Sequence, residues 1–220
     1  MPGAEAWFSP QVLQAVVAGL FLATGWIVAA AQTRRRDAAL RQSREDDLQR
    51  ALLAEIRAHV FALEQQAPSP EDAQALIARI AAGRFVPSLP QQANDRIFAA
   101  VIADIHILPA PVIDPVVLYY RLLSIMGSLA TDLRRIARHD GQRAAQMMAD
   151  YLSLMDETRE TGLHAMRVLT ASLRGGAAEV ERMLDADEAA AAAAIAARLP
   201  GDLAALRDRL NSRSSDPRGR

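Results

Sequence analysis

Four histidines are the first candidates for acid–base or metal chemistry in this sequence: His59, His106, His139 and His164. No two of them are four residues apart, the spacing of a zinc-binding helix. None has a glutamate three residues before it, which a di-iron helical bundle requires. Their spacing therefore predicts no metal centre, and we expect neither a metal nor any other cofactor.

Two local clusters could still suggest hydrolysis. His139-Asp140 has the form of a metal phosphohydrolase dyad, but the pair also suits the end of one helix and the cap of the next. An acidic cluster follows on a later helix, formed by Asp156, Glu157 and Glu160 with Arg159 among them. Such a mixture is typical of a solvated helix face with ion pairs. We therefore expect no catalytic residue in either cluster.

Composition excludes further enzyme classes. All 25 basic residues are arginine, and the chain has no cysteine. Without lysine there is no Walker phosphate loop and no Schiff-base amine. Without cysteine there is no disulfide, thiolate zinc site or thiol nucleophile. No G-x-S-x-G elbow or glycine-rich dinucleotide loop occurs either, so the sequence favours a protein that is not an enzyme. Abundant alanine and arginine indicate a GC-rich bacterial genome.

The net charge of −1 conceals a local excess of positive charge. Residues 34–44 contain five arginines and one acid, whereas residues 45–220 contain 20 arginines and 24 acids. The concentrated patch is Arg34-Arg35-Arg36, directly after an apolar segment. This position favours contact with anionic lipid headgroups over binding to nucleic acid.

The apolar segment, residues 12–31, reads VLQAVVAGLFLATGWIVAAA. Twenty helical residues extend about 30 Å, the thickness of a hydrocarbon core. We therefore predict a transmembrane helix over residues 12–32. Because basic residues remain on the cytoplasmic side, residues 1–11 are expected outside the bacterial inner membrane and the remainder in the cytoplasm.

Two alternatives compete with a transmembrane anchor. Ala29-Ala30-Ala31 before Gln32 fits a signal-peptide cleavage site, although no basic residue precedes the apolar run. A buried helix of a soluble protein is the other, but it rarely needs apolar residues on every side. Within the predicted span, Ala15, Gly19 and Ala23 share one face, where a second membrane helix could approach closely.

The cytoplasmic part is predicted to be helical throughout. A juxtamembrane stalk is expected over residues 33–67, with an apolar stripe formed by Leu48, Leu52, Ile56, Val60 and Leu63. Ser69 and Pro70 are typical of a helix start, which predicts a helix over 70–82 closed by Gly83. Residues 84–90 read as a loop, residues 91–107 as a helix, and the prolines at 109 and 111 as its end.

The strongest pattern predicts a long antiparallel helical hairpin over residues 115–174, beginning at Asp114-Pro115. Its first helix has the 3-4-3-4-3 spacing of a coiled-coil seam, formed by Tyr119, Leu122, Met126, Leu129, Leu133 and Ile136. A second stripe follows a short turn, and two helices joined in this way should run antiparallel. Thr158 and Gly162 interrupt that stripe, which indicates a bend or a close approach of another helix.

The remaining residues continue the helical pattern. Gly175-Gly176 indicates a hinge, and an alanine-rich helix is expected over 177–199. Pro200-Gly201-Asp202 should stop it before a short final helix over 203–210, and residues 211–220 read as a disordered tail. The bundle is thus predicted to comprise residues 68–174, followed by two further helices over 175–210. No strand pattern with convincing alternation and no internal repeat is found.

Residues 94–123 place Leu108-Pro109 after one helix and Val116-Val117 with Tyr120 at the start of the next. This arrangement resembles a group of bacterial proteins with an N-terminal membrane span and a cytoplasmic helical domain. The segment LLAEI, residues 52–56, is similar to the first cytoplasmic helix of that group. The resemblance implies the topology and a helical fold, and it implies no activity.

Together these patterns predict an all-α protein: an N-terminal transmembrane helix followed by a cytoplasmic bundle. The function we expect is that of a membrane-anchored helical interaction protein, an accessory or scaffolding subunit. It would bind a protein partner or a second copy of itself. The alternative is a membrane-tethered ligand-binding or sensor bundle, with a cavity at Thr158 and Gly162.

Overall fold

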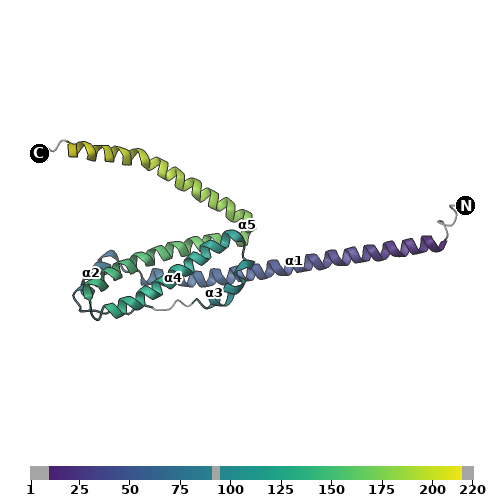
Figure 1. Ribbon diagram of the computed structural model, residues 1–220, viewed down its shortest axis with the longest axis horizontal. Coiled ribbons are helices and arrows are strands. Elements are labelled where there is room, and N and C mark those ends of the chain that lie inside the picture. Colours follow the sequence, from purple (N-terminus) through teal and green to yellow (C-terminus); the bar gives the residue numbers. More distant parts are fainter. Residues whose placement is uncertain (1–9, 91–94, 215–220) are drawn as a thin grey trace. The chain divides into compact units, whose positions relative to one another are not determined.

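The computed structural model describes residues 10–90 and 95–214, and within them every regular element is helical. The elements, shown in Figure 1, are α1 (Pro10–Gln66), α2 (Pro70–Ala81), α3 (Arg96–Val101), the 3-10 helix η2 (Ile102–Ile107), α4 (Ala110–Ile136) and α5 (Gly141–Ser214). The all-α prediction is therefore confirmed for the described residues.

The chain divides into two compact units, Met1–Leu48 and Gln49–Arg220, and α1 contributes to both. The described part of the first unit is a single stretch of helix. Its large apolar side chains Phe21, Trp26, Ile27 and Leu40 are exposed. In the second unit, α1 supplies core residues, so the latter half of the predicted stalk belongs to the bundle.

The core of the second unit lies among α1, α2, α4 and α5. α4 and the first part of α5 pack against each other and are joined by residues 137–140. From α1, Leu52, Ile56, Val60 and Leu63 are buried, which confirms the apolar stripe from residue 52 onward. Leu48 is only half-buried, since the bundle begins at the next residue.

The start of α2 follows the local chemistry predicted from the sequence. The Ser69 hydroxyl accepts a hydrogen bond from the backbone N–H of Asp72 at 3.1 Å, and Pro70 occupies the first helical position. Gly83 follows the helix with a φ of +67°, a conformation that favours glycine. Ile80 is the buried anchor of α2.

The segment between α2 and α4 differs from the prediction. The expected helix over 91–107 is an α-helical turn over 96–101 and a 3-10 helix over 102–107, while residues 91–94 lie outside the described part. α4 begins at Ala110, and Pro115 lies inside it, so the predicted start at Asp114-Pro115 is wrong. Pro115 is the sixth residue of α4, beyond the first four amides that have no intrahelical acceptor, so it leaves the Pro111 carbonyl without its helical donor.

α5 contains one break, at the predicted hinge. Gly175 and Gly176 leave helical geometry, and Gly176 has a φ of +67°. The helix then continues through Pro200 and Gly201 to Ser214, so the predicted stop and the separate helix over 203–210 are wrong. Residues 211–214 of the predicted tail are helical, and residues 215–220 lie outside the described part.

α4 is, among the described residues, the helix that is long and apolar enough to cross a membrane by length and composition. A third of its most apolar stretch is buried inside the bundle. Several side chains of the predicted span at 12–32 lie outside the described residues.

Candidate functional site

The residues from which the membrane topology is predicted lie on α1. Arg34, Arg35 and Arg36 are all exposed, as are Gly19 and Ala23 of the proposed helix-pairing face. A Cβ at Gly19 would meet no atom within 4 Å. The side chain of Ala15 lies outside the described residues. Helical spacing does place these three small residues on one face of α1.

The predicted seam of α4 faces the core. Tyr119, Leu122, Met126 and Leu133 are buried, while Leu129 and Ile136 are half-buried and pack against the same core cluster. On α5, the residues Ala144, Met148, Tyr151 and Met155 are also buried. Their side chains therefore serve packing and are not available as a binding surface.

The clusters that could have suggested hydrolysis lie on the surface. The Asp140 carboxylate accepts the backbone N–H of Arg143 at 2.9 Å, which confirms the capping interpretation of this residue. Asp156, Glu157 and Glu160 are exposed, and Glu160 is 3.7 Å from Arg159. In the described part of the chain, no three histidine or acidic side chains converge in a way that could hold a metal ion.

The most concentrated polar chemistry in the core surrounds Glu55 of α1, which the sequence analysis did not single out. Its buried carboxylate accepts three hydrogen bonds: from the N–H of Ile97 at 2.7 Å, the N–H of Phe98 at 3.0 Å and the hydroxyl of Tyr120 at 2.6 Å. One side chain thus connects α1, the start of α3 and α4. The available signal was that Glu55 is adjacent to the apolar stripe, three residues after Leu52.

Aromatic rings enclose this carboxylate. Phe98 stacks on Tyr120 with 3.9 Å between ring centroids and 7° between planes, and Tyr119 contacts Tyr120 edge-on. Burial raises the pKa of Tyr120, and its hydrogen bond to Glu55 raises it further. Burial, followed by the negative charge of Glu55, also raises the pKa of Tyr119. Both phenols therefore remain neutral at physiological pH. The neutral phenol of Tyr120, by donating to the Glu55 carboxylate, joins α4 to α1.

The cavity predicted at Thr158 and Gly162 is absent from the described bundle. A Cβ on Gly162 would lie 2.5 Å from Cγ2 of Val60 and 2.7 Å from Cε2 of Tyr119, so α1 and α4 fill this space. Thr158 is fully buried and donates its hydroxyl hydrogen to the Leu154 carbonyl at 2.7 Å. The interruption of the stripe therefore marks a close approach of helices, the other possibility that the sequence offered.

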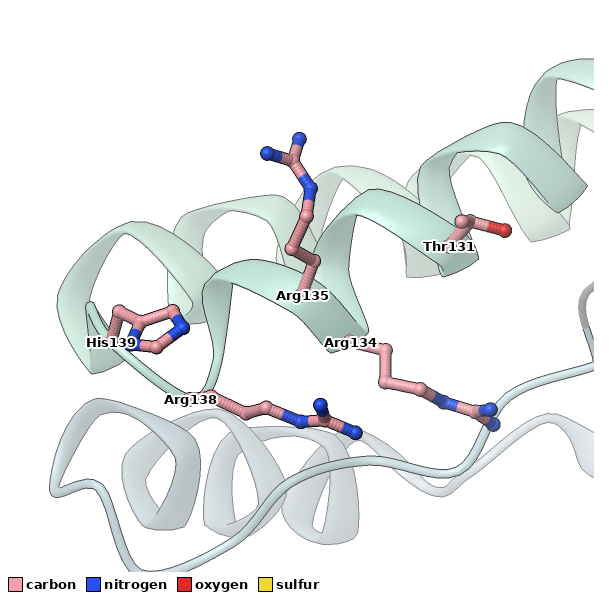
Figure 2. A pocket seen from close by; sticks show the side chains of 5 residues that line it. All are labelled: Thr131, Arg134, Arg135, Arg138 and His139. Carbon is pink, nitrogen blue, oxygen red and sulfur yellow. The ribbon is translucent and has the colours of Figure 1, made fainter.

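An arginine-rich hollow of about 160 Å³ lies at the end of α4, lined by Thr131, Arg134, Arg135, Arg138 and His139. Figure 2 shows Arg134 and Arg138 extending to one side and Arg135 to the other. Arg134 donates to the Leu89 carbonyl at 3.3 Å, and Arg135 pairs with Asp132 at 2.8 Å. Arginines at a helix C-terminus are stabilised by its exposed carbonyls, which at the same time disfavour a bound anion. This hollow is therefore a structural feature of the helix end.

A larger groove of about 460 Å³ lies at the Gly175-Gly176 break of α5. It is lined from both sides of the break, by Leu163, Met166, Arg167, Thr170, Ala171, Arg174, Glu179 and Met183. The volume is in the range of small-molecule sites, about 300–1,000 Å³. The sequence analysis identified the hinge but not the groove, because the lining depends on how the two parts of α5 meet.

Comparison with known protein families, curated proteins and solved structures finds no match to this chain. The resemblance of residues 94–123 thus gains no support from a matching family.

Proposed function

We propose that this protein is a membrane-anchored helical interaction protein, an accessory or scaffolding subunit of a bacterial inner-membrane assembly. Residues 12–32 would form the anchor, with the N-terminus outside and the bundle in the cytoplasm. The long hairpin of α4 and α5, with its coiled-coil seam, would supply a rigid body for binding a partner.

The observation that carries the proposal is the exposure of large apolar side chains on α1. Phe21 and Trp26 are each 77% exposed and Ile27 is 60% exposed. Exposing such a series of large apolar groups to water is unfavourable, and lipid would bury them while the helix satisfies its own backbone. The exposed arginines at 34–36 directly follow, where the cytoplasmic headgroups would lie.

Orientation can be tested with single cysteines, because the natural chain has none. Glu5→Cys would be labelled by a membrane-impermeant maleimide in intact spheroplasts. Ser128→Cys, at an exposed position on α4, would be labelled only after permeabilisation. Recovery of the intact protein in the soluble fraction after lysis would refute the anchor. Labelling of both cysteines from the same side would refute the orientation.

The charge of the arginine cluster provides a second test of orientation. Replacing Arg34, Arg35 and Arg36 together by glutamine removes the basic residues that retain this end in the cytoplasm. The triple variant is expected to give a mixed population in which Ser128→Cys becomes partly accessible from outside. An unchanged labelling pattern would mean that other features set the orientation.

The role as a subunit is tested by purification in mild detergent and identification of the proteins that co-purify. We expect a defined partner or a stable homo-oligomer, and a lone monomer would refute the role. Gly19→Ile would block close pairing on the small-residue face, whereas Gly25→Ile on another face is the control. Loss of association in the first variant alone would support pairing through Ala15, Gly19 and Ala23, and equal association of both would exclude it.

A further inference from the structure

The groove at the Gly175-Gly176 break combines apolar walls with an excess of positive charge. Leu163, Met166, Ala171 and Met183 supply the walls. Methionine side chains are flexible and polarisable, so they adapt to apolar ligands of different shape. A groove of this composition favours a ligand that has an apolar portion of its own.

Among the charged side chains in and beside the groove, one arginine has no partner of opposite charge among the described residues. Arg167 is 3.4 Å from Asp187, and Glu179 pairs with Arg182. Arg174 forms no ion pair or hydrogen bond with any described residue. The lining itself carries two arginines and one glutamate. It is therefore complementary to one negative charge.

The backbone at the break requires glycine. A Cβ on Gly175 would lie 2.8 Å from Cβ of Glu179, so the two parts of α5 meet there at a distance that only glycine permits. Beyond the break, Val180 is fully buried, and Met183 of the groove follows one turn later.

From this geometry we propose that the groove binds an amphipathic anion, a carboxylate on an aliphatic chain. The chain lies against Met166 and Met183, and the carboxylate pairs with Arg174. A guanidinium offers a carboxylate two parallel N–H donors, which gives direction as well as charge. This assignment concerns the second unit alone and does not depend on the proposed membrane anchor.

The test is a titration of the full chain with octanoate, followed by NMR of ¹³C-labelled methionine methyl groups. The protein is used in lipid nanodiscs, or in buffer if it is soluble. Octanoate is expected to shift the Met166 and Met183 resonances saturably, whereas octanol and octylammonium, with the same chain, bind at least about fivefold more weakly. Equal affinity for all three probes, or no saturable shift at these two methionines, would overturn the proposal.

Substitutions at position 174 test whether Arg174 is the group that binds the carboxylate. Arg174→Gln is expected to weaken octanoate binding by about fivefold to tenfold, and Arg174→Glu to change the preference to octylammonium. Arg143→Gln, on an exposed position of α5 outside the groove, is the matched control and should bind as the natural protein does. Because Arg174 is exposed, these substitutions are expected to leave the fold intact, and circular dichroism checks this. Unchanged octanoate affinity in both Arg174 variants would also overturn the assignment.

Discussion

Tyr120 donates its phenolic hydrogen to the carboxylate of Glu55 across 2.6 Å, although 65 residues separate the two in the sequence. Its neighbour Tyr119 is equally well buried, but the Tyr119 hydroxyl has no hydrogen-bond partner among the described residues. Two adjacent tyrosines in the same core thus differ, because only the hydroxyl of Tyr120 is hydrogen-bonded.

This contrast predicts opposite effects of the same substitution. Tyr120→Phe removes a bond to a charged acceptor and is expected to destabilise the protein by about 1.5–3 kcal/mol. Tyr119→Phe removes a hydroxyl with no partner and is expected to be neutral or stabilising by up to about 1 kcal/mol. Urea unfolding of both variants, followed by circular dichroism, measures the difference. Equal destabilisation would contradict the hydrogen-bonding pattern described.

Glycine at position 162 is expected to be required by packing. Gly162→Ala adds a methyl group that would overlap Val60 and Tyr119, which costs about 1–3 kcal/mol and outweighs the gain of about 1 kcal/mol from alanine helix propensity. Gly201→Ala is the matched control in the same helix, since a Cβ there meets nothing within 4 Å. Thermal unfolding should show a lower Tm for the first variant and an equal or higher Tm for the second. A Tm that rises in both would show that α1 and α4 give way to the methyl group.

All three tyrosines of the chain, Tyr119, Tyr120 and Tyr151, have their pKa raised above 10, in each case chiefly by burial. The unfolded chain would release these protons near pH 10, so folding stability is expected to fall as pH rises through that value. Tyrosinate absorbance should therefore appear together with the loss of helical circular dichroism. Ionisation of even one tyrosine near pH 10 in a fully helical protein would disagree with this burial.

Because of His164, the folding stability of the protein should fall on mild acidification. Burial lowers its pKa below 6.5, and Arg167 lowers it further, while Asp187 acts in the opposite direction. The unfolded chain then takes up a proton at higher pH than the folded chain. Stability is accordingly full above 6.5, decreases as pH falls through this value and becomes constant below the folded pKa.

The variant His164→Gln should lack this component of the pH dependence. Free energies of unfolding measured between about pH 8 and pH 5 would show a smaller decrease than in the natural protein. His139→Gln is the control, because His139 is exposed in the turn between α4 and α5. Identical pH profiles for the natural protein and His164→Gln would contradict the lowered pKa.

Local chemistry made some elements predictable from the sequence. Ser69 and Pro70 specify the start of α2 through contacts within one helical turn, and Gly175-Gly176 breaks α5 through its own backbone preferences. Proline was the less dependable signal, because Pro115 and Pro200 are both accommodated inside helices. A proline removes one hydrogen bond, and the surrounding helix can tolerate that loss.

The polar centre of the bundle could not be predicted in the same way. Glu55 lies beside the apolar stripe of α1, but nothing in the sequence shows that the backbone amides of Ile97 and Phe98 donate to it. The groove depends likewise on Met166 and Met183 lining it from the two sides of the break. Neither arrangement produces a periodic pattern in the sequence, because the fold decides which residues come together.

The attachment of the segment between α2 and α4 has a consequence for local unfolding. Neither α3 nor η2 contains a fully buried side chain. The Glu55 carboxylate holds the start of α3, and Arg134 contacts Ser88 and Leu89 earlier in the chain. Regions with little apolar burial open at low free energy, so we expect α3 and η2 to detach while α4 and the first part of α5 stay folded. In hydrogen exchange, the amides of Ile97 and Phe98 would then exchange together and well before the core of α4. Replacement of Glu55 alone, for example by glutamine, would therefore change how often α3 leaves the bundle.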